Sequence, residues 1–451
     1  MRRWCVTVAF AIQLGCAGAA AQTVDGAADM PVRASSLGLE EAVRLALENN
    51  LRTVAAAEGV AQAKGAKGAS LSALLPHLSA VASQTNLTAN LAALGMPMDA
   101  MPMPAFVGPY NRFDARVQLA QSVFDLAAVR RWQASGEAVE AARAGERLAE
   151  QTVAAATAVA YLAALEAAQG VESAQANLRL AETLRDLAEH QKGAGLAAGI
   201  DVARAETRLA NQKVGLARAQ TALDNARLDL FRLVAGSSGE PLAAAELGDT
   251  MRIAEEPAID AAEAVRQALA ERPEVALAER ELKVAELGRK AASAGHLPTI
   301  GVFGDYGSSG LLPNDTSLPT RSVGVQMNLP VFDGGRTRAE TRSAASRQRE
   351  AEARLKDVRA EVEKDVRQAL LNVGTFKEQA EAAKVAVALA ERELELSRDR
   401  FANGVADNTE MVAAQAALEN ARQVYVSAVA GYNLARLNLA AALGHAERFR
   451  L

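Results

Sequence analysis

The feature that most constrains this sequence is an internal duplication. The string EAVR at 41–44 recurs at 263–266, and VQLAQSVFD at 117–125 recurs as VQMNLPVFD at 325–333. A chain that repeats a unit of this size is expected to build an arrangement with approximate internal symmetry. Two copies of long helical tracts around short strands favour a symmetric tube over the layout of an enzyme.

Each copy contains the same series of predicted elements. A helix is expected at about 38–75, where apolar residues recur at spacings of three and four until Pro76. A segment with a period of two follows, and then a long tract without proline, at 126–193 and again at 336–402. At ~1.5 Å per residue, each tract would be on the order of 100 Å long as a helix, so extended coiled coils are expected.

The second long tract carries two apolar stripes on neighbouring faces. The first follows a heptad-like spacing through Val387, Ala390, Leu394, Ser397 and Phe401. The second consists of Val385, Leu389 and Leu396. An ordinary helical bundle accounts for one stripe, whereas two stripes favour a cylindrical wall in which each helix has neighbours on both sides.

Two segments, at about 113–124 and 321–332, alternate between apolar and polar residues with the period of a β-strand, which predicts one apolar and one polar face. Each is preceded by a weaker partner strand, at about 76–88 and 298–307. No stretch after residue 21 approaches the ~20 apolar residues of a membrane-spanning helix, so any membrane crossing is expected through strands. Four strands cannot close a membrane barrel, and an open sheet edge in lipid leaves backbone groups unpaired. The chain must therefore associate if its strands lie in a membrane; a soluble sheet of two hairpins is the alternative.

The first 21 residues have the features of a secretory signal peptide. Arg2 and Arg3 precede an apolar segment, and the residues at 19–21 form an Ala-Ala-Ala cleavage site. Cys16 follows Leu-Gly, as in a lipoprotein signal, but Gln13 stands where such signals generally carry Leu, Val or Ile. Ordinary cleavage is therefore favoured over lipidation of Cys16.

The duplication also sets the expected domain boundaries. The first copy spans 38–236 and the second spans 260–444. A GSSG stretch at 307–310 predicts a hairpin loop in the second copy. The remaining segments are an N-terminal linker at 22–37, an inter-repeat linker at 237–259 and a C-terminal tail at 445–451.

Taken together, these features resemble the TolC-like outer-membrane efflux proteins, the outer membrane factors of tripartite efflux and type I secretion systems. Each copy opens with an EAVRxAL-type helix, closes its strand pair in VFD, and breaks its long helix at a glycine six residues before an acid. The resemblance covers about 38–444. It implies an α+β membrane protein in which three chains form one 12-stranded β-barrel, four strands from each, continued by an α-helical tunnel through the periplasm.

The resemblance also implies a function. A homotrimer in the outer-membrane lipid of a Gram-negative bacterium would passively export drugs, metals or polypeptides through a tunnel with an openable periplasmic tip. It would dock on a periplasmic adaptor (membrane fusion) protein and an inner-membrane pump. A periplasmic coiled-coil adaptor and an envelope scaffold protein are the alternatives, and duplication around bilayer-length strands argues against both.

The resemblance assigns candidate residues to the two turns at the tip, 193–201 and 403–410. Asp201 and Glu410 are candidates for an acidic ring at a pore constriction, although either residue could simply begin its helix. Adaptor contact is the candidate role of Gly195, Leu196, Gly404 and Val405, and a plain turn is the alternative.

The copies differ at positions that bear on this assignment. Pro330 in the second copy is Ser122 in the first, so the bend into the long helix is expected to differ. Ala413 stands where family members often carry a second acid, which argues against a double acidic ring. Asp125 and Asp333 are expected to cap the long helices.

No catalytic or cofactor motif is present, and the sequence predicts a protein that is not an enzyme and has no cofactor. Basic and acidic residues are interspersed, 49 against 54, so a nucleic-acid partner is not expected. The most unusual local feature is a methionine cluster in the first hairpin. Its members are Met96, Met98, Met101 and Met103. They are weak candidates for a Cu(I) site, and an apolar loop is favoured.

Overall fold

The computed structural model describes residues 36–451, apart from 92, 94–103, 105, 196, 236–245, 255–258, 314–316, 404 and 406–407. The expected signal peptide, nearly all of the N-terminal linker and the four methionines therefore lie outside the described residues. The first copy contains α1 Leu39–Asn49, α2 Leu51–Ser72, β1 His77–Asn90, β2 Phe106–Phe124, α3 Leu126–Gly193 and α4 Gly199–Ala235. The second contains α5 Ala261–Glu271, α6 Pro273–Ser293, η3 Ala294–His296, β3 Thr299–Gly310, β4 Leu318–Asn328, α7 Arg336–Ala402, α8 Asn408–Ala442 and η4 Ala446–Arg448.

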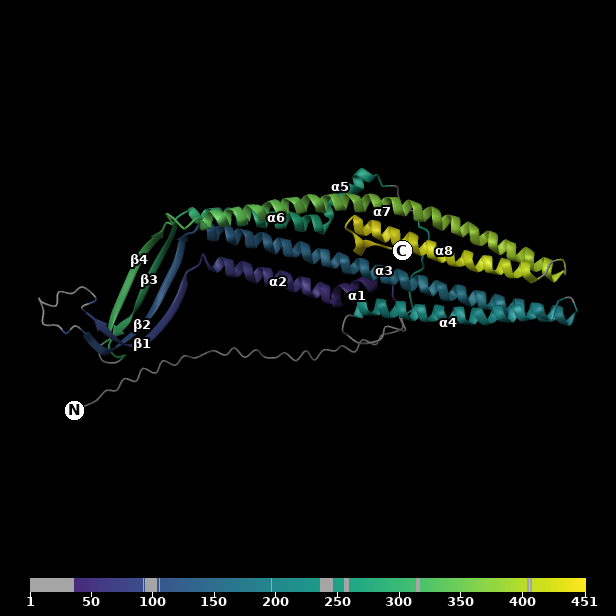
Figure 1. Ribbon diagram of the computed structural model, residues 1–451, viewed down its shortest axis with the longest axis horizontal. Coiled ribbons are helices and arrows are strands. Elements are labelled where there is room, and N and C mark those ends of the chain that lie inside the picture. Colours follow the sequence, from purple (N-terminus) through teal and green to yellow (C-terminus); the bar gives the residue numbers. More distant parts are fainter. Residues whose placement is uncertain are drawn as a thin grey trace, which may run out of the picture. The chain divides into compact units, whose positions relative to one another are not determined.

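The long helices pack side by side along the described part of the chain (Figure 1). Helix α3 contacts α2, α4 and α6, and α7 contacts α6 and α8. The α3–α4 hairpin of the first copy also touches the α7–α8 hairpin of the second, through contacts between α3 and α8. The two long tracts expected as helices, 126–193 and 336–402, match α3 and α7.

The helix predicted over 38–75 is wrong as a single element, because it breaks at Asn50. Asn50 has extended backbone angles, φ −74° and ψ 131°, and its side chain accepts the Arg52 N–H, which starts α2 anew. The second copy breaks at the equivalent Arg272, and Pro273 follows as the first residue of α6. A residue before proline avoids the helical region, so the break in the second copy has a local cause.

The four strands form one antiparallel sheet in the order β1-β2-β3-β4. Strand β2 begins seven residues before the predicted 113, and the GSSG stretch at 307–310 is part of β3 rather than a hairpin loop. Gly307 lies opposite Arg116, and a Cβ on Gly307 would stand 2.4 Å from the Arg116 Cβ. Glycine at 307 is therefore a requirement of strand packing, which a turn prediction misses.

The two hairpins end differently, as the Pro330/Ser122 difference suggests. Strand β2 continues through Ser122 to Phe124 with an irregularity in register, whereas β4 stops at Asn328 and not at the predicted 332. Pro330 has no N–H to donate to a neighbouring strand, which explains the earlier stop.

The sheet has one apolar and one polar face. On the apolar face Val323, Val325 and Met327 are 87%, 72% and 60% exposed in the single chain. On the polar face the Arg116 guanidinium lies 2.5 Å from Asp114 and 3.1 Å from Asp305, and the Ser322 hydroxyl donates to Asp305 at 2.6 Å. The predicted alternation is thus present in the fold.

The main hydrophobic core lies where α3 meets α1, α4 and α8. Tyr161 and Leu165 of α3 are buried there against Val429 and Leu437 of α8. Contrary to expectation, α3 contains a stretch that is long and apolar enough to cross a membrane by composition alone. Because side chains of α3 fill this core, we assign the stretch to helix packing.

Candidate functional site

The first candidate site is the turn between α3 and α4. Its reversal passes through Gly195, whose φ of 75° is in the left-handed region, and the Gly195 N–H donates to the Lys192 carbonyl at 3.0 Å. The Asp201 carboxylate accepts the Ala198 N–H at 3.0 Å and lies 3.7 Å from Arg204. A glycine is needed at Gly195 because a Cβ is strained at this φ, and Asp201 helps to close the first turn of α4.

The equivalent turn between α7 and α8 is built differently. The Asn403 side-chain amide donates to the Asp399 carbonyl at 2.7 Å, and the Val405 N–H donates to the Arg400 carbonyl at 2.9 Å. The Val405 side chain is 69% exposed. Glu410, in the first turn of α8, lies 3.4 Å from the Arg400 guanidinium.

The predicted tip residues therefore fall at two equivalent turns with unequal surroundings. The Asp201 side chain is 17% exposed and the Glu410 side chain 43%. Leu196 and Gly404 lie outside the described residues. The acidic-ring and adaptor-contact roles of these residues stay predictions.

A buried glutamine joins the two hairpins near their turns. Gln191, near the end of α3, donates its amide to the carbonyls of Phe401 and Ala402 at the end of α7, both at 3.3 Å. Gln191 is 7% exposed, and Phe401 packs beside it with Leu184 and Met411. Because the bonds run to backbone oxygens, they hold the two helix ends at a set register.

A second polar cluster joins the hairpins further from the turns. Glu419 of α8 pairs with Arg208 of α4 and accepts a hydrogen bond from Gln212 at 2.7 Å. Arg422, one turn further along α8, binds the Asn177 side chain of α3 at 3.1 Å. Sequence reasoning missed this cluster, and the available signal was polar residues four apart, 208 with 212 and 415 with 419, on otherwise apolar helix faces.

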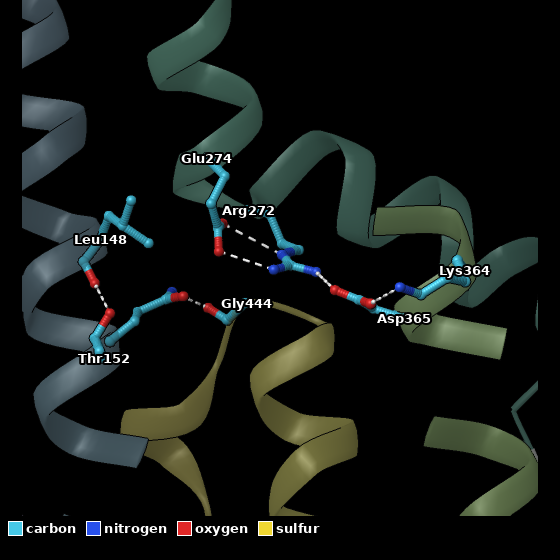
Figure 2. A network of polar contacts seen from close by, with 8 residues as sticks. Leu148, Thr152, Arg272, Glu274, Lys364, Asp365 and Gly444 are labelled. Atoms are coloured by element: carbon cyan, nitrogen blue, oxygen red, sulfur yellow. Dashed lines mark hydrogen bonds and ion pairs between the residues drawn. The ribbon is translucent and has the colours of Figure 1, made fainter. Parts of the chain in front are cut away.

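A third polar site lies where α5 meets α6 (Figure 2). Arg272 binds Glu274 at 2.8 Å and Asp365 of α7 at 3.1 Å. Burial by itself lowers the pKa of the Arg272 guanidinium, but its bonds to Glu274 and Asp365 outweigh this, so the pKa is raised. The Gln151 side chain of α3 donates to the Gly444 carbonyl nearby.

These side chains line a cavity of about 440 Å³ between α3, α6, α7 and α8. The positive charge of Arg272 is balanced by carboxylates within the chain, which is typical of an ion pair that stabilises the packing of helices rather than of a ligand-binding site. Within the described ranges, no group of three or more His, Cys, Asp or Glu side chains is arranged to hold a metal ion. No described site has the arrangement of a nucleophile with its base.

Comparison with known proteins gives a consistent result. A family model described as "Outer membrane efflux protein" matches residues 42–236 and 264–445. The chain is 26% identical over 356 residues to the outer membrane protein TolC of Escherichia coli (strain K12), covering 74% of this chain and 70% of TolC. It is 27% identical over 402 residues to the alkaline protease secretion protein AprF of Pseudomonas aeruginosa, covering 86% and 80% of the two chains.

Solved structures share the fold at lower identity. The outer-membrane channel OprN matches with a TM-score of 0.80 at 20% identity, over 90% of each chain. The outer membrane protein VceC of Vibrio cholerae matches with a TM-score of 0.77 at 18% identity, over 90% of this chain and 96% of VceC. The fold is therefore that of a channel with four strands per chain and a helical tunnel, and not that of a periplasmic adaptor or scaffold.

Proposed function

The chain belongs to the outer membrane efflux protein family and is an outer-membrane efflux channel, and from that premise we propose that three copies assemble into one channel. The observation that carries this proposal is the unfinished sheet. Within the described residues β1 pairs only with β2, and β4 pairs only with β3, so each sheet edge has unpaired backbone groups. Lipid does not tolerate such edges, and four strands are too few to close. Pairing β4 of one copy with β1 of the next closes twelve strands.

The exposed stripe of α7 supports the same assembly. Leu394 and Phe401 of the first stripe are buried within the chain, whereas Val385, Leu389 and Leu396 of the second are 59%, 67% and 50% exposed. Packing against a neighbouring copy would remove this apolar surface from water.

The two hairpin turns would form the periplasmic tip of the assembled tunnel. We propose that Asp201 and Glu410 place six carboxylates near the threefold axis, and that the tip opens when the α7–α8 hairpin moves away from α3–α4. Such movement breaks the bonds of Gln191 and Glu419. A periplasmic adaptor would bind at Gly195, Leu196, Gly404 and Val405, and an inner-membrane pump would supply the energy.

The cargo would be chosen by that pump. AprF is named for secretion of an alkaline protease and OpmQ of Pseudomonas aeruginosa for export of pyoverdine, so relatives serve both a polypeptide and a small molecule. The polar face of the sheet, with Arg116, Asp114 and Asp305, would line a hydrated passage that carries either kind of cargo.

Membrane fractionation of cells expressing the full chain tests the assembly. We expect recovery in the outer membrane as a trimer that resists SDS and dissociates on boiling. In planar bilayers, the purified trimer should give discrete conductance steps. A monomer or dimer in the outer-membrane fraction would contradict the proposed assembly.

A further inference from the structure

Basic side chains gather at the ends of the four helices that adjoin the sheet. The nine helical residues nearest the strands in α2, α3, α6 and α7 span 64–72, 126–134, 285–293 and 336–344. Together they hold nine Lys or Arg and two Asp or Glu. The whole sequence has a small acidic excess, 54 against 49. The fold thus brings basic side chains together at the helix ends that adjoin the sheet, although basic and acidic residues are interspersed along the sequence.

Contacts between the helices fix that level. A Cβ on Gly136 of α3 would lie 3.9 Å from Lys67 of α2, and Glu137 binds Arg280 of α6 at 2.9 Å. A Cβ on Gly295 would lie 3.1 Å from Thr337, at the start of α7. Counting residues from these contacts at ~1.5 Å each puts the nine basic residues of the four helices within about 30 Å along the helix axes, and Lys67, Arg289, Lys290, Arg338 and Arg342 within about 20 Å.

Seven of these nine basic residues have no acidic partner among the described residues. We name five of the seven, Lys67, Arg289, Lys290, Arg338 and Arg342, the basic collar. All five are exposed, and none forms an ion pair with any residue that the structure describes. By contrast Arg336 pairs with Glu340 at 3.1 Å, and Arg131 lies 3.8 Å from Asp125. A cluster of unpaired cations repels itself, so an external anion would stabilise it.

Exposed apolar side chains lie between the basic collar and the strands. Val331 and Phe332, which connect β4 to α7, are each 89% exposed, and Leu75 before β1 is 49% exposed. Leu297, before β3, is 41% exposed. An apolar belt followed by long basic side chains is the pattern found where a protein passes from hydrocarbon to an anionic headgroup layer.

We propose that the basic collar binds the headgroups of acidic phospholipids in the periplasmic leaflet of the outer membrane, while the apolar belt contacts their acyl chains. The inference rests on the proposed barrel, because the sheet must lie in the membrane. The belt favours the lipid side over the lumen, since exposed Val331 and Phe332 would be costly in a hydrated passage. Each basic side chain at a membrane surface strengthens binding to acidic lipid by about fivefold.

The test compares lipid retained by three forms of the full-length trimer. The collar variant replaces all five collar residues with glutamine. A matched control replaces Arg179, Lys213, Arg218, Lys384 and Arg398, which lie elsewhere on α3, α4 and α7, are exposed and form no ion pair with the described residues. Each protein is exchanged into vesicles of phosphatidylcholine with a minor fraction of phosphatidylglycerol, re-extracted, and assayed for both lipids.

We expect wild type and control to enrich phosphatidylglycerol at least fivefold over phosphatidylcholine, and the collar variant to enrich it less than twofold. Added inorganic phosphate should not displace the lipid, which separates a headgroup site from a free-phosphate site. Equal enrichment in the collar variant and wild type overturns the proposal. So does a changed anion-to-cation permeability ratio with lipid enrichment intact, because the collar would then face the lumen.

Two variants with fewer substitutions are used if replacing all five collar residues prevents assembly of the trimer. R289Q with K290Q neutralises the α6 part, and R338Q with R342Q neutralises the α7 part. Each should lose part of the enrichment while the SDS-resistant trimer persists. Loss of the trimer in wild type would contradict the proposed assembly itself, and is scored separately from lipid retention.

Discussion

At the level of single residues, equivalent positions in the two copies have different bonding partners. Asp201 helps to close the first turn of α4 through the Ala198 N–H. Glu410 instead faces Arg400 across its turn. The bond of Asp201 to the backbone serves the fold, whereas the Glu410 carboxylate is paired with Arg400 and is 43% exposed. Substitutions that keep the shape and remove only the charge can separate these roles.

We expect D201N with E410Q to lower the cation preference of the channel, measured as the reversal potential in asymmetric salt. Asparagine still accepts the Ala198 N–H, so helix capping is kept while six charges of the trimer are lost. D201A is the comparison, because it should also cost about 1 kcal/mol of stability through the lost cap. An unchanged reversal potential in the charge-neutral form would remove the acidic ring.

Asp333 provides a pH-dependent contact at the start of α7. Its carboxylate accepts bonds from the Thr337 hydroxyl, the Thr337 N–H and the Gly335 N–H, and these lower the pKa of Asp333 to about 2 from 3.8. A lowered carboxylate pKa stabilises the folded state above the unfolded value and loses that effect as pH falls through the folded value.

The difference in stability between wild type and D333N should therefore be constant near neutral pH and shrink between about pH 4 and pH 2. Thermal unfolding of the detergent-solubilised protein across this range measures it. T337V removes one donor and should move the loss to higher pH. A difference that stays constant down to pH 2 would show that Asp333 is not held by these bonds.

At the scale of elements, the two copies cap their first helices by different means. In the second copy, Asp260 accepts the N–H groups of Ala262 and Glu263, which is a local cap. In the first, Gly38 occupies the cap position, and Asp249 from the inter-repeat segment accepts the Leu39 N–H at 2.8 Å. The first helix thus depends on a residue 210 positions away.

Asp249 also binds a buried tyrosine. The Tyr161 hydroxyl bonds to the Asp249 carboxylate and the Leu37 carbonyl, both at 2.8 Å. Burial and then the bond to Asp249 raise the pKa of Tyr161, so the phenol stays protonated and can donate. The inter-repeat segment, α1 and α3 are therefore joined through one carboxylate.

D249A should cost more stability than D260A. Removing Asp249 leaves the Leu39 N–H without its acceptor and takes one partner from the buried Tyr161 hydroxyl. We expect the free energy of unfolding to fall by about 2–3 kcal/mol. D260A removes a single exposed cap, at about 1 kcal/mol. Denaturant unfolding of the two variants compares them directly, and equal losses would mean that Asp249 contributes no more than an ordinary cap.

At the scale of the whole molecule, the exposed surface of one chain indicates what must cover it. The stripe of Val385, Leu389 and Leu396 is apolar and lies on the helix that also buries Leu394 inside the chain. Burying a leucine is worth about 1.5–3 kcal/mol, so an interface built on such side chains depends strongly on each.

Replacing Leu389 and Leu396 with glutamine should lower the fraction of SDS-resistant trimer at least tenfold, since two buried side chains are lost at each of three interfaces. E381Q, an exposed polar position on the same helix, serves as the control and should assemble normally. Full assembly of the double variant would place the subunit contact elsewhere on the chain.

Much of this architecture was readable because its signals are local and repeated. The proline-free tracts, the period-two segments ending in VFD and the glycine before each acid predict α3, α7, the strands and the two turns. The predictions failed where the position of a residue depends on a partner that is distant in the sequence. Gly307 resembles a turn residue but sits in β3 to admit Arg116, and no local pattern marks the pairing of Glu419 with Arg208.

The duplicated helices and strands, and the family to which they point, follow from local sequence patterns, because periodicity and turn chemistry act within a few residues. Which charged side chains form ion pairs and which do not depends on how the helices pack in three dimensions. The packing of the helices joins the hairpins through Gln191 and Glu419, and it gathers basic side chains from three separate helices into the basic collar. Such arrangements depend on the register between helices, which distant contacts set and no short stretch of sequence encodes.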